Sequence, residues 1–140
     1  MPDTAPKAGP KKILYIEDDE TLAALVCVLL KTHGYDVEHF ALGKAGLERF
    51  YQVFPSWDAV VVDLDLPDVS GRDLVPEMVA QRPNLPIVIY SGQNGPRFGL
   101  DNRFELYATG ASAFLWKPSG GQALLDVLKE LLEIPPKPLA

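Results

Sequence analysis

The sequence predicts an α/β fold in which a doubly wound parallel sheet lies between two layers of helices. Four short apolar runs lack polar alternation, as do strands that are buried on both faces of a parallel sheet: Ile13–Ile16, Ala59–Val62, Ile87–Tyr90 and Ala113–Trp116. A further strand is expected at Asp36–Phe40. Helical segments alternate with these five strands, and this alternation is typical of a three-layer domain.

The helices are predicted from apolar residues at helical spacing and from residues that begin or end helices. The expected apolar faces are Leu22, Leu25, Val26, Leu29 and Leu30; Leu47, Phe50, Tyr51 and Phe54; Leu74, Val75, Met78 and Val79; and Leu124, Leu125, Leu128, Leu131 and Leu132. Gly34 is expected to cap the first helix, and Pro76 is tolerable only in a first turn. A glycine-rich loop precedes a helix expected from about Arg103 to Thr109, and Ser119 with Gln122 forms a capping box for the last helix.

Length and composition indicate one domain without a covalent staple. A chain of 140 residues can bury about two thirds of its unfolded surface, and its single cysteine cannot form an internal disulfide. The net charge of -6 argues against nucleic-acid binding through the overall charge of the domain. With no signal peptide and no long apolar run, we expect a soluble cytoplasmic protein. We expect a flexible leader at 1–10, a folded domain at 11–134 and a proline-rich tail at 135–140.

Polar residues with reactive side chains stand at the ends of the predicted strands. Asp63 directly follows the central run, Glu17 and Asp18 follow the first, and Ser91 and Lys117 follow the last two. Ligand sites of open α/β sheets lie beyond the carboxyl ends of the strands, so Asp63 is the leading functional candidate. Its own segment alone leaves open that it merely begins a turn.

The remaining metal-binding or nucleophilic residue types give no signal of their own. His33 and His39 lack a Cys or His neighbour at ligand spacing, so we interpret both as ordinary surface or edge residues. Cys27 falls off the main apolar stripe of its helix and is interpreted as an unreactive, half-buried thiol.

Four motifs in order resemble the receiver domain of two-component response regulators, over residues 11 to about 134. They are ILYIEDDE, VVVDLDLPDVSG, PIVIYSG and GASAFLWKP, and their combination is far more specific than any one of them. The resemblance implies a flavodoxin-like sheet with strand order 2-1-3-4-5. It also implies that the protein signals and is not a metabolic enzyme, although it assists its own phosphorylation and dephosphorylation.

The resemblance also assigns roles to individual residues. Asp63 would be the phosphorylated residue, and Mg²⁺ would be held by Glu17, Asp18, Asp63 and the backbone carbonyl of Asp65. Ser91 would contact the phosphoryl group and Lys117 would pair with it, with a cis peptide bond before Pro118. Ser91 and Phe114 would form the switch, because the Phe114 ring matches the aromatic residue that swings inward when the serine moves.

The chemistry of these residues is consistent with that assignment. Two carboxylates about 5 Å apart at an effective dielectric constant near 20 repel by roughly 3 kcal/mol, so clustered acids need a cation. Mg²⁺ takes oxygen ligands and keeps waters, which leaves a position for a phosphate oxygen. Mg²⁺ and Lys117 would neutralise charge on the phosphoryl group while Asp63 attacks it.

Two features depart from the commonest receiver pattern. Asp65 places a second acid two residues after the acceptor, which should alter hydrolysis of the phosphoryl bond in a direction that the sequence does not give. The segment between Ser91 and Lys117 is a few residues longer than is typical, which places extra glycine-rich chain in the segment that the receiver family uses as its switch.

Two other functions remain open at this point. VVVDLDLP also resembles the Asp-x-Asp motif of haloacid-dehalogenase-like phosphatases, in which Asp63 would be the nucleophile and Asp65 the general acid. Against it, Pro67 replaces the usual Thr or Val, and no cap domain or later acid pair follows. The second alternative is a receiver-like module that works by protein contact without phosphorylation.

The expected partners follow from the receiver hypothesis. The phosphoryl donor would be a histidine kinase or a histidine phosphotransfer protein, and a downstream protein would be the target. A homodimer through the face of the fourth helix, fifth strand and fifth helix is a further expectation, while nucleic acid and membrane are not expected partners. The chain ends in PPKPLA, so the signal would pass by protein contact, or these residues begin a linker cut from a longer protein.

Overall fold

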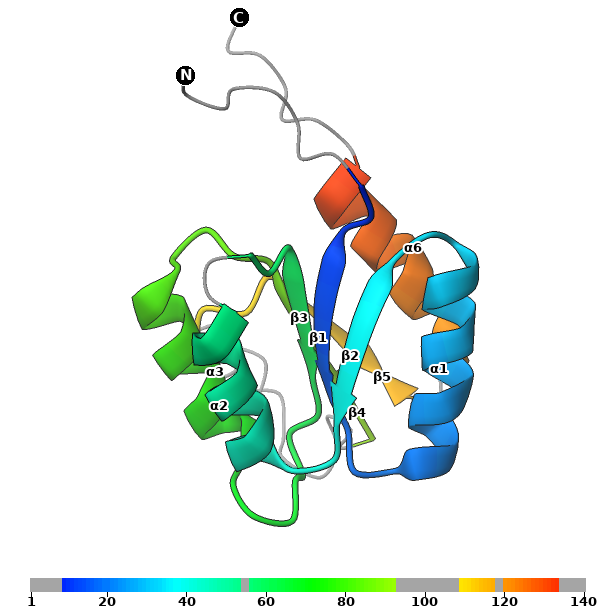
Figure 1. The fold of residues 1–140 in the computed structure, drawn as a ribbon. Helices are drawn as coiled ribbons and strands as arrows, with labels where there is room; N and C mark the ends of the chain where they lie inside the picture. The colour runs from blue at the N-terminus through cyan, green and yellow to red at the C-terminus, as the bar shows by residue number, and fades with distance from the viewer. Residues whose placement is uncertain (1–8, 54–55, 93–108, 118–119, 134–140) are drawn as a thin grey trace, which may run out of the picture.

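A five-stranded parallel sheet organises the protein, which we describe from a computed structural model (Figure 1). The structure describes residues 9–53, 56–92, 109–117 and 120–133. The elements are β1 (Lys12–Ile16), α1 (Glu20–Thr32), β2 (Asp36–Phe40), α2 (Gly43–Val53), β3 (Ala59–Val62), α3 (Gly71–Gln81), β4 (Ile87–Ser91), β5 (Ala113–Trp116) and α6 (Gly120–Glu133). The strand order is β2-β1-β3-β4-β5, and every strand pair is parallel, which confirms the predicted fold class and order.

The sheet separates two apolar clusters, because successive side chains of each strand point to opposite faces. Figure 1 shows α2 and α3 on one face and α1 and α6 on the other. On the α2/α3 face lie alternate strand residues such as Val60 and Val62 with Phe50 of α2. On the α1/α6 face lie Val61 and Leu128 of α6. All four residues of β3 are fully buried, as predicted for a central strand covered on both sides.

The ends of α1 are determined by side-chain and backbone capping. The Asp19 side chain accepts a hydrogen bond from the backbone N–H of Leu22, which satisfies one of the free N–H groups of the first turn. At the other end Gly34 has a φ angle of +92°, a conformation that favours glycine, which confirms it as the residue that ends this helix. Asp19 thereby fixes the chain directly after the Glu17–Asp18 acid pair.

Three expectations about the helices are wrong: two concern buried faces and one concerns the position of a proline. Leu25 is 66% exposed, because the buried stripe of α1 is narrower than its run of apolar residues and consists of Ala23, Val26 and Leu30. Tyr51 is 42% exposed, and its hydroxyl donates to the Glu77 carboxylate of α3 at the surface. Pro76 lies beyond the first turn of α3, which begins at Gly71, and its exposed position lets water replace the hydrogen bond that the ring removes.

Some predictions concern residues outside those that the structure describes. They are the leader up to residue 8, Phe54, the helix expected over 103–108, the cis peptide before Pro118, the capping role of Ser119 and the tail from residue 134. Thr109, the expected last residue of that helix, lies in a turn. Within the described ranges, no helix has the length and apolar character needed to span a bilayer.

Candidate functional site

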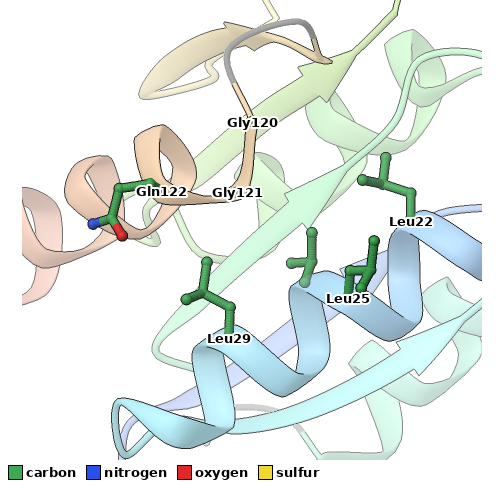
Figure 2. A pocket seen from close by; sticks show the side chains of 7 residues that line it. Leu22, Leu25, Leu29, Gly120, Gly121 and Gln122 are labelled. Carbon is green, nitrogen blue, oxygen red and sulfur yellow. The ribbon is translucent and has the colours of Figure 1, made fainter.

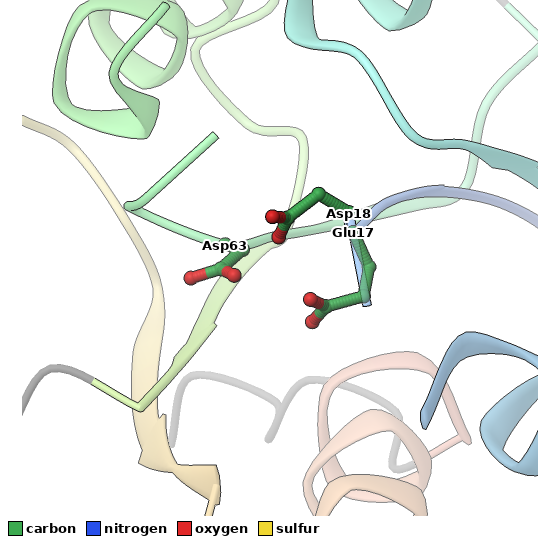
Figure 3. A group of neighbouring side chains, drawn as sticks. All are labelled: Glu17, Asp18 and Asp63. Atoms are coloured by element: carbon green, nitrogen blue, oxygen red, sulfur yellow. The ribbon is translucent and has the colours of Figure 1, made fainter. Parts of the chain in front are cut away.

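Three carboxylates meet at the edge of the sheet where the strands end. Glu17 follows β1 and Asp63 follows β3, and these two strands are neighbours in register. One carboxylate oxygen from each of Glu17, Asp18 and Asp63 lies within 4.8 Å of the other two. Figure 3 shows the three side chains converging from the two strand ends. The structure therefore brings together the acids that the sequence predicted to form one site.

The burial of these acids differs sharply. Glu17 is fully buried and Asp63 is 3% exposed, whereas Asp18 is exposed. Burial disfavours a charged carboxylate, so the two buried acids need a close cation. We refer to Glu17, Asp18 and Asp63 together as the acidic site.

Lys117 supplies that cation from the end of β5. Its Nζ donates to Glu17 Oε2 at 2.8 Å and to Asp63 Oδ2 at 2.9 Å, so one ammonium group joins the two buried carboxylates. Burial lowers the pKa of Lys117, but the hydrogen bonds to Glu17 and Asp63 outweigh it and leave the pKa raised. Lys117 is therefore a permanent positive charge inside the acidic site.

Burial disfavours the charged form of the Glu17 carboxylate even though Lys117 lies beside it. Burial, opposed by the hydrogen bond from Lys117 and reinforced by the Asp63 charge, raises the pKa of Glu17 from 4.5 to about 7. One ammonium shared between two carboxylates does not compensate both of them. A divalent cation with hard oxygen ligands would do so, because the donor set consists of three carboxylates. The residues present therefore fit Mg²⁺.

The backbone of Glu17 is fixed by β2 through a residue that sequence reasoning missed. The ring Nε2 of His39 lies 2.7 Å from the carbonyl oxygen of Glu17, and because a carbonyl only accepts, the nitrogen donates. The backbone N–H of Glu17 donates to the Phe40 carbonyl at 2.9 Å. The register of β1 with β2, in which Tyr15 is paired with His39, is the signal that could have identified His39.

Hydrogen bonds fix the loop between β3 and α3 close to Asp63. The Asp65 backbone N–H donates to Asp63 Oδ1 at 3.2 Å. Further along, the Asp68 carboxylate accepts from the backbone N–H groups of Gly43 and Lys44, at the first turn of α2. At Gly71 an added Cβ would collide with the Asp63 carbonyl oxygen, so only glycine allows α3 to begin this close to the site. These contacts fix the chain around Asp65, whose backbone carbonyl is the predicted fourth ligand.

The predicted switch residues lie at the same edge of the sheet. Ser91 is the last residue of β4, is fully buried and is paired with Trp116 of β5. Phe114 and Trp116 are both partly buried and pack against the cluster on the α2/α3 face, which confirms that they share one side of β5. Trp57 is 1% exposed and directly precedes the segment that enters β3, so it lies at the opposite end of the sheet from Asp63.

An apolar pocket of about 450 Å³ opens between α1 and α6 (Figure 2). It is lined by Leu22, Leu25, Val26, Leu29, Gly120, Gly121 and Gln122. Leu22 follows Asp18 by four residues and Gly120 follows Lys117 by three, so residues from both helices that line the pocket lie close in sequence to Asp18 or Lys117. The exposed Leu25 forms part of this apolar pocket.

Comparison with known protein families gives a match over most of the chain. Residues 13–129 match the family described as the response regulator receiver domain. Among curated proteins, the cell cycle transcriptional regulator CtrA of Caulobacter vibrioides is 32% identical over 109 residues, which are 76% of this chain and 44% of that protein. The transcriptional regulatory protein QseB of Escherichia coli O157:H7 is 32% identical over 120 residues, 86% of this chain and 51% of that protein. The chain thus spans about half the length of these relatives.

Solved structures give the same result. A CheY-like receiver domain protein from Methanospirillum hungatei JF-1 superposes with a TM-score of 0.79 at 28% identity, covering 89% of this chain and 94% of that one. The chemotaxis response regulator CheY4 of Vibrio cholerae superposes with a TM-score of 0.77 at 26% identity, covering 88% and 99%. Both similarities extend over nearly the whole of the solved chains.

Proposed function

Because this chain belongs to the response regulator receiver domain family of two-component signal transduction, we propose that it accepts a phosphoryl group from a phosphohistidine onto Asp63. The family comprises signalling domains and not metabolic enzymes. One observation carries the assignment to Asp63. Its carboxylate ends the central strand and lies between Glu17, Asp18 and the Lys117 ammonium, where both a metal ion and a fixed cation can act on a bound anion.

In the proposed reaction, the Asp63 carboxylate is the nucleophile. A carboxylate oxygen forms a bond to phosphorus while the bond from phosphorus to the donor imidazole nitrogen breaks, and the imidazole leaves with that electron pair. Mg²⁺, held by Glu17, Asp18, Asp63 and the Asp65 carbonyl, would supply charge neutralisation for the donor phosphate. Oδ2 of Asp63 is held by Lys117 and Oδ1 accepts from the Asp65 N–H, so the carboxylate is oriented before the donor arrives.

Lys117 has a second role after transfer. Its ammonium now bridges Glu17 and Asp63, and we expect it to pair with a phosphoryl oxygen once Asp63 carries the group. The Ser91 hydroxyl would donate to another phosphoryl oxygen. Its movement would leave space that the partly buried Phe114 ring fills, and the altered surface near Trp116 would be what a target protein contacts.

The partners that this function requires are a phosphodonor protein and a downstream target. We assign the donor role to a histidine kinase or a histidine phosphotransfer protein. The apolar pocket between α1 and α6 supports a protein donor, because it presents the exposed Leu25 and its lining residues lie close in sequence to Asp18 and Lys117. A net charge of -6 is consistent with contact to proteins and not to nucleic acid through this domain. A homodimer through β5 and its flanking helices stays a prediction.

The two rival functions differ in support. The phosphatase alternative rests on Asp63 and Asp65 alone, and the family match over residues 13–129 leaves it without support. The phosphorylation-independent module has the same fold, so only a measurement of phosphoryl transfer separates it from the proposed function.

The test is intact-mass measurement of the protein with Mg²⁺ and a small acyl phosphate donor. We expect the wild type to gain one phosphoryl group and Asp63→Asn to gain none, because the amide is a poor nucleophile. Asp58→Asn is a matched control, since Asp58 lies at the other end of β3, where its carboxylate accepts from the Lys12 backbone N–H. Equal incorporation in wild type and Asp63→Asn would overturn the assignment. A lack of incorporation from both small donors and phosphohistidine proteins would favour the phosphorylation-independent module.

A further inference from the structure

Three buried polar atoms lie without a hydrogen-bond partner among the described residues. They are the hydroxyls of Tyr15 and Tyr90 and Oε1 of Glu17. All three residues are fully buried. Burial of a polar group without a partner is costly, so such groups in folded proteins are normally satisfied by protein or by an ordered water. One unpartnered atom could be an isolated cost, but three, one of them an oxygen of the acidic site, call for a common explanation.

The sheet register places these three residues on one face of the sheet, toward the end that carries the acidic site. Tyr15 precedes Glu17 by two residues on β1, so both side chains point to the α1/α6 face. β1, β3 and β4 are paired in parallel, and the row that follows Ile16 and its partners consists of Glu17, Asp63 and Tyr90. Tyr90 belongs to the same apolar cluster as Tyr15. Tyr15 therefore precedes Glu17 on the same side of its own strand, and Tyr90 lies in the same row as Glu17, on the far side of Asp63.

The electrostatics agree with this placement. Burial first, and then the charge of Glu17, raises the pKa of Tyr15. Burial also raises the pKa of Tyr90, where the Lys117 charge opposes and the Glu17 charge adds to the effect. Both hydroxyls thus lie within electrostatic reach of the same carboxylate.

The two oxygens of Glu17 face different surroundings. Oε2 accepts from Lys117 at 2.8 Å and from the Asp19 backbone N–H at 3.1 Å, on the side of the acidic site. Oε1 is shielded from solvent and has no such donor among the described residues. Because the carboxylate is planar, holding Oε1 also fixes the direction in which Oε2 points.

We propose that Tyr15, Tyr90 and Glu17 Oε1 form a buried binding site for an ordered water molecule that positions the Glu17 carboxylate. A buried water typically makes about three hydrogen bonds, which is the number of unpartnered atoms here. The water donates to Oε1, and each phenol can donate to it or accept from it. Tyr15 and Tyr90 are therefore positioning residues for a predicted metal ligand, which they support from outside the acidic site.

The first arm of the test needs neither Mg²⁺ nor phosphate, so it is independent of the proposed function. The midpoints of thermal unfolding are compared for wild type, Tyr15→Phe, Tyr90→Phe and the double variant. If both hydroxyls bind one water, each single variant unfolds at a lower temperature, and the double variant loses less than the two single losses together. If the hydroxyls have no partner, their removal raises the midpoint or leaves it unchanged, and that result overturns the proposal.

The second arm measures Mg²⁺ affinity by titration, which a merely structural role would leave unchanged. It rests on the metal site of the proposed function. We expect Tyr15→Phe to weaken Mg²⁺ binding by about 10-fold, as is typical when a group that orients a ligand is removed. Tyr35→Phe is the control, because Tyr35 is buried in the same cluster but precedes β2 at the far end of the sheet. Unchanged affinity in Tyr15→Phe beside a wild type that binds would overturn the positioning role, whereas a wild type that binds no Mg²⁺ would instead contradict the proposed function.

Discussion

The two ends of the sheet carry charged residues in opposite arrangements. At the amino end, Lys12 Nζ lies 3.3 Å from Asp36 and 3.1 Å from Glu38, and Arg49 pairs with Glu38 at 2.8 Å. The Lys12 ammonium also lies 5.4 Å from the centre of the Trp57 ring. These charges are partly exposed, and each has an opposite partner. At the carboxyl end three carboxylates lie together, and the two buried ones, Glu17 and Asp63, share one lysine.

This difference separates charges that are compensated within the protein from charges that need a bound ion. Exposed charges that each have an opposite partner contribute little to the free energy of unfolding, and they need no bound ion. Uncompensated buried acids cost stability, and such groups in folded proteins often mark functional sites, in agreement with the proposed binding of a cation and a phosphoryl group. The raised pKa of Glu17 and the lowered pKa of Glu38 express the same contrast, since burial dominates the first and the hydrogen bond from Arg49 the second.

The largest expected effect is on metal binding. Asp18→Ala should lose Mg²⁺ affinity and phosphorylation together. Asp18 is the solvent-exposed carboxylate of the acidic site, and an anionic donor needs the metal. We expect affinity to fall at least about 10-fold in a calorimetric titration. Asp36→Ala is the control from the amino end. If Asp18→Ala still binds Mg²⁺ as the wild type does, the acid pair is wrongly assigned.

A second prediction concerns stability and pH without Mg²⁺. Because the folded state raises the pKa of Glu17 from 4.5 to about 7, it binds this proton more tightly than the unfolded chain does. The stabilising contribution is therefore present below about pH 4.5 and is lost as pH rises through about 7, by up to about 3 kcal/mol. Denaturant unfolding at several pH values should show this slope in the wild type and not in Glu17→Gln.

Glu38→Gln is the matched control for that measurement. The Arg49 hydrogen bond lowers the pKa of Glu38, so its contribution has the opposite sign and is lost as pH falls. Because this pair is partly exposed, we expect a difference below about 1 kcal/mol. If the slope between pH 4.5 and 7 were the same in wild type and Glu17→Gln, the cost of burying Glu17 would be wrongly assigned.

The third prediction uses the two tryptophans as reporters of the two ends. Trp57 lies at the amino end, where its indole N–H donates to the Phe50 carbonyl at 3.1 Å. Trp116 is paired with Ser91, so it should sense a phosphoryl analogue on Asp63. Trp57→Phe should keep a Mg²⁺-dependent fluorescence change on addition of beryllofluoride, and Trp116→Phe should lose it. A change that disappears with Trp57 instead would refute a signal route through Ser91 and β5.

Much of the fold could be predicted because four of the five strands are local apolar runs, and the residues after these runs meet at one edge of the parallel sheet. Asp63, Glu17, Asp18 and Lys117 follow from that rule together with the family motifs. Their pairing could not be predicted, since the bridge from Lys117 to two carboxylates depends on side-chain directions.

The residues that support the site were harder to predict. From the sequence, His39 was predicted to be an ordinary surface or edge residue. Its contact with Glu17 arises from the register between β1 and β2, and no motif contains His39. The sequence indicated only that Tyr15 and Tyr90 are core residues. An apolar run can contain a tyrosine, but it does not predict the hydrogen-bond partner of the hydroxyl. Leu25 was predicted to be buried because periodicity gives the direction of a helix face but not how much of it a neighbouring element covers.

The central claim is that the buried acid between Lys117 and the other carboxylates takes the phosphoryl group. Its most direct test is reduction of the phosphorylated protein with borohydride, which converts an aspartyl phosphate to homoserine, followed by peptide mass spectrometry. We predict homoserine at position 63 alone, formed only when Mg²⁺ and donor were both present. Homoserine at position 18 or 65, or conversion that does not require Mg²⁺, would contradict the account.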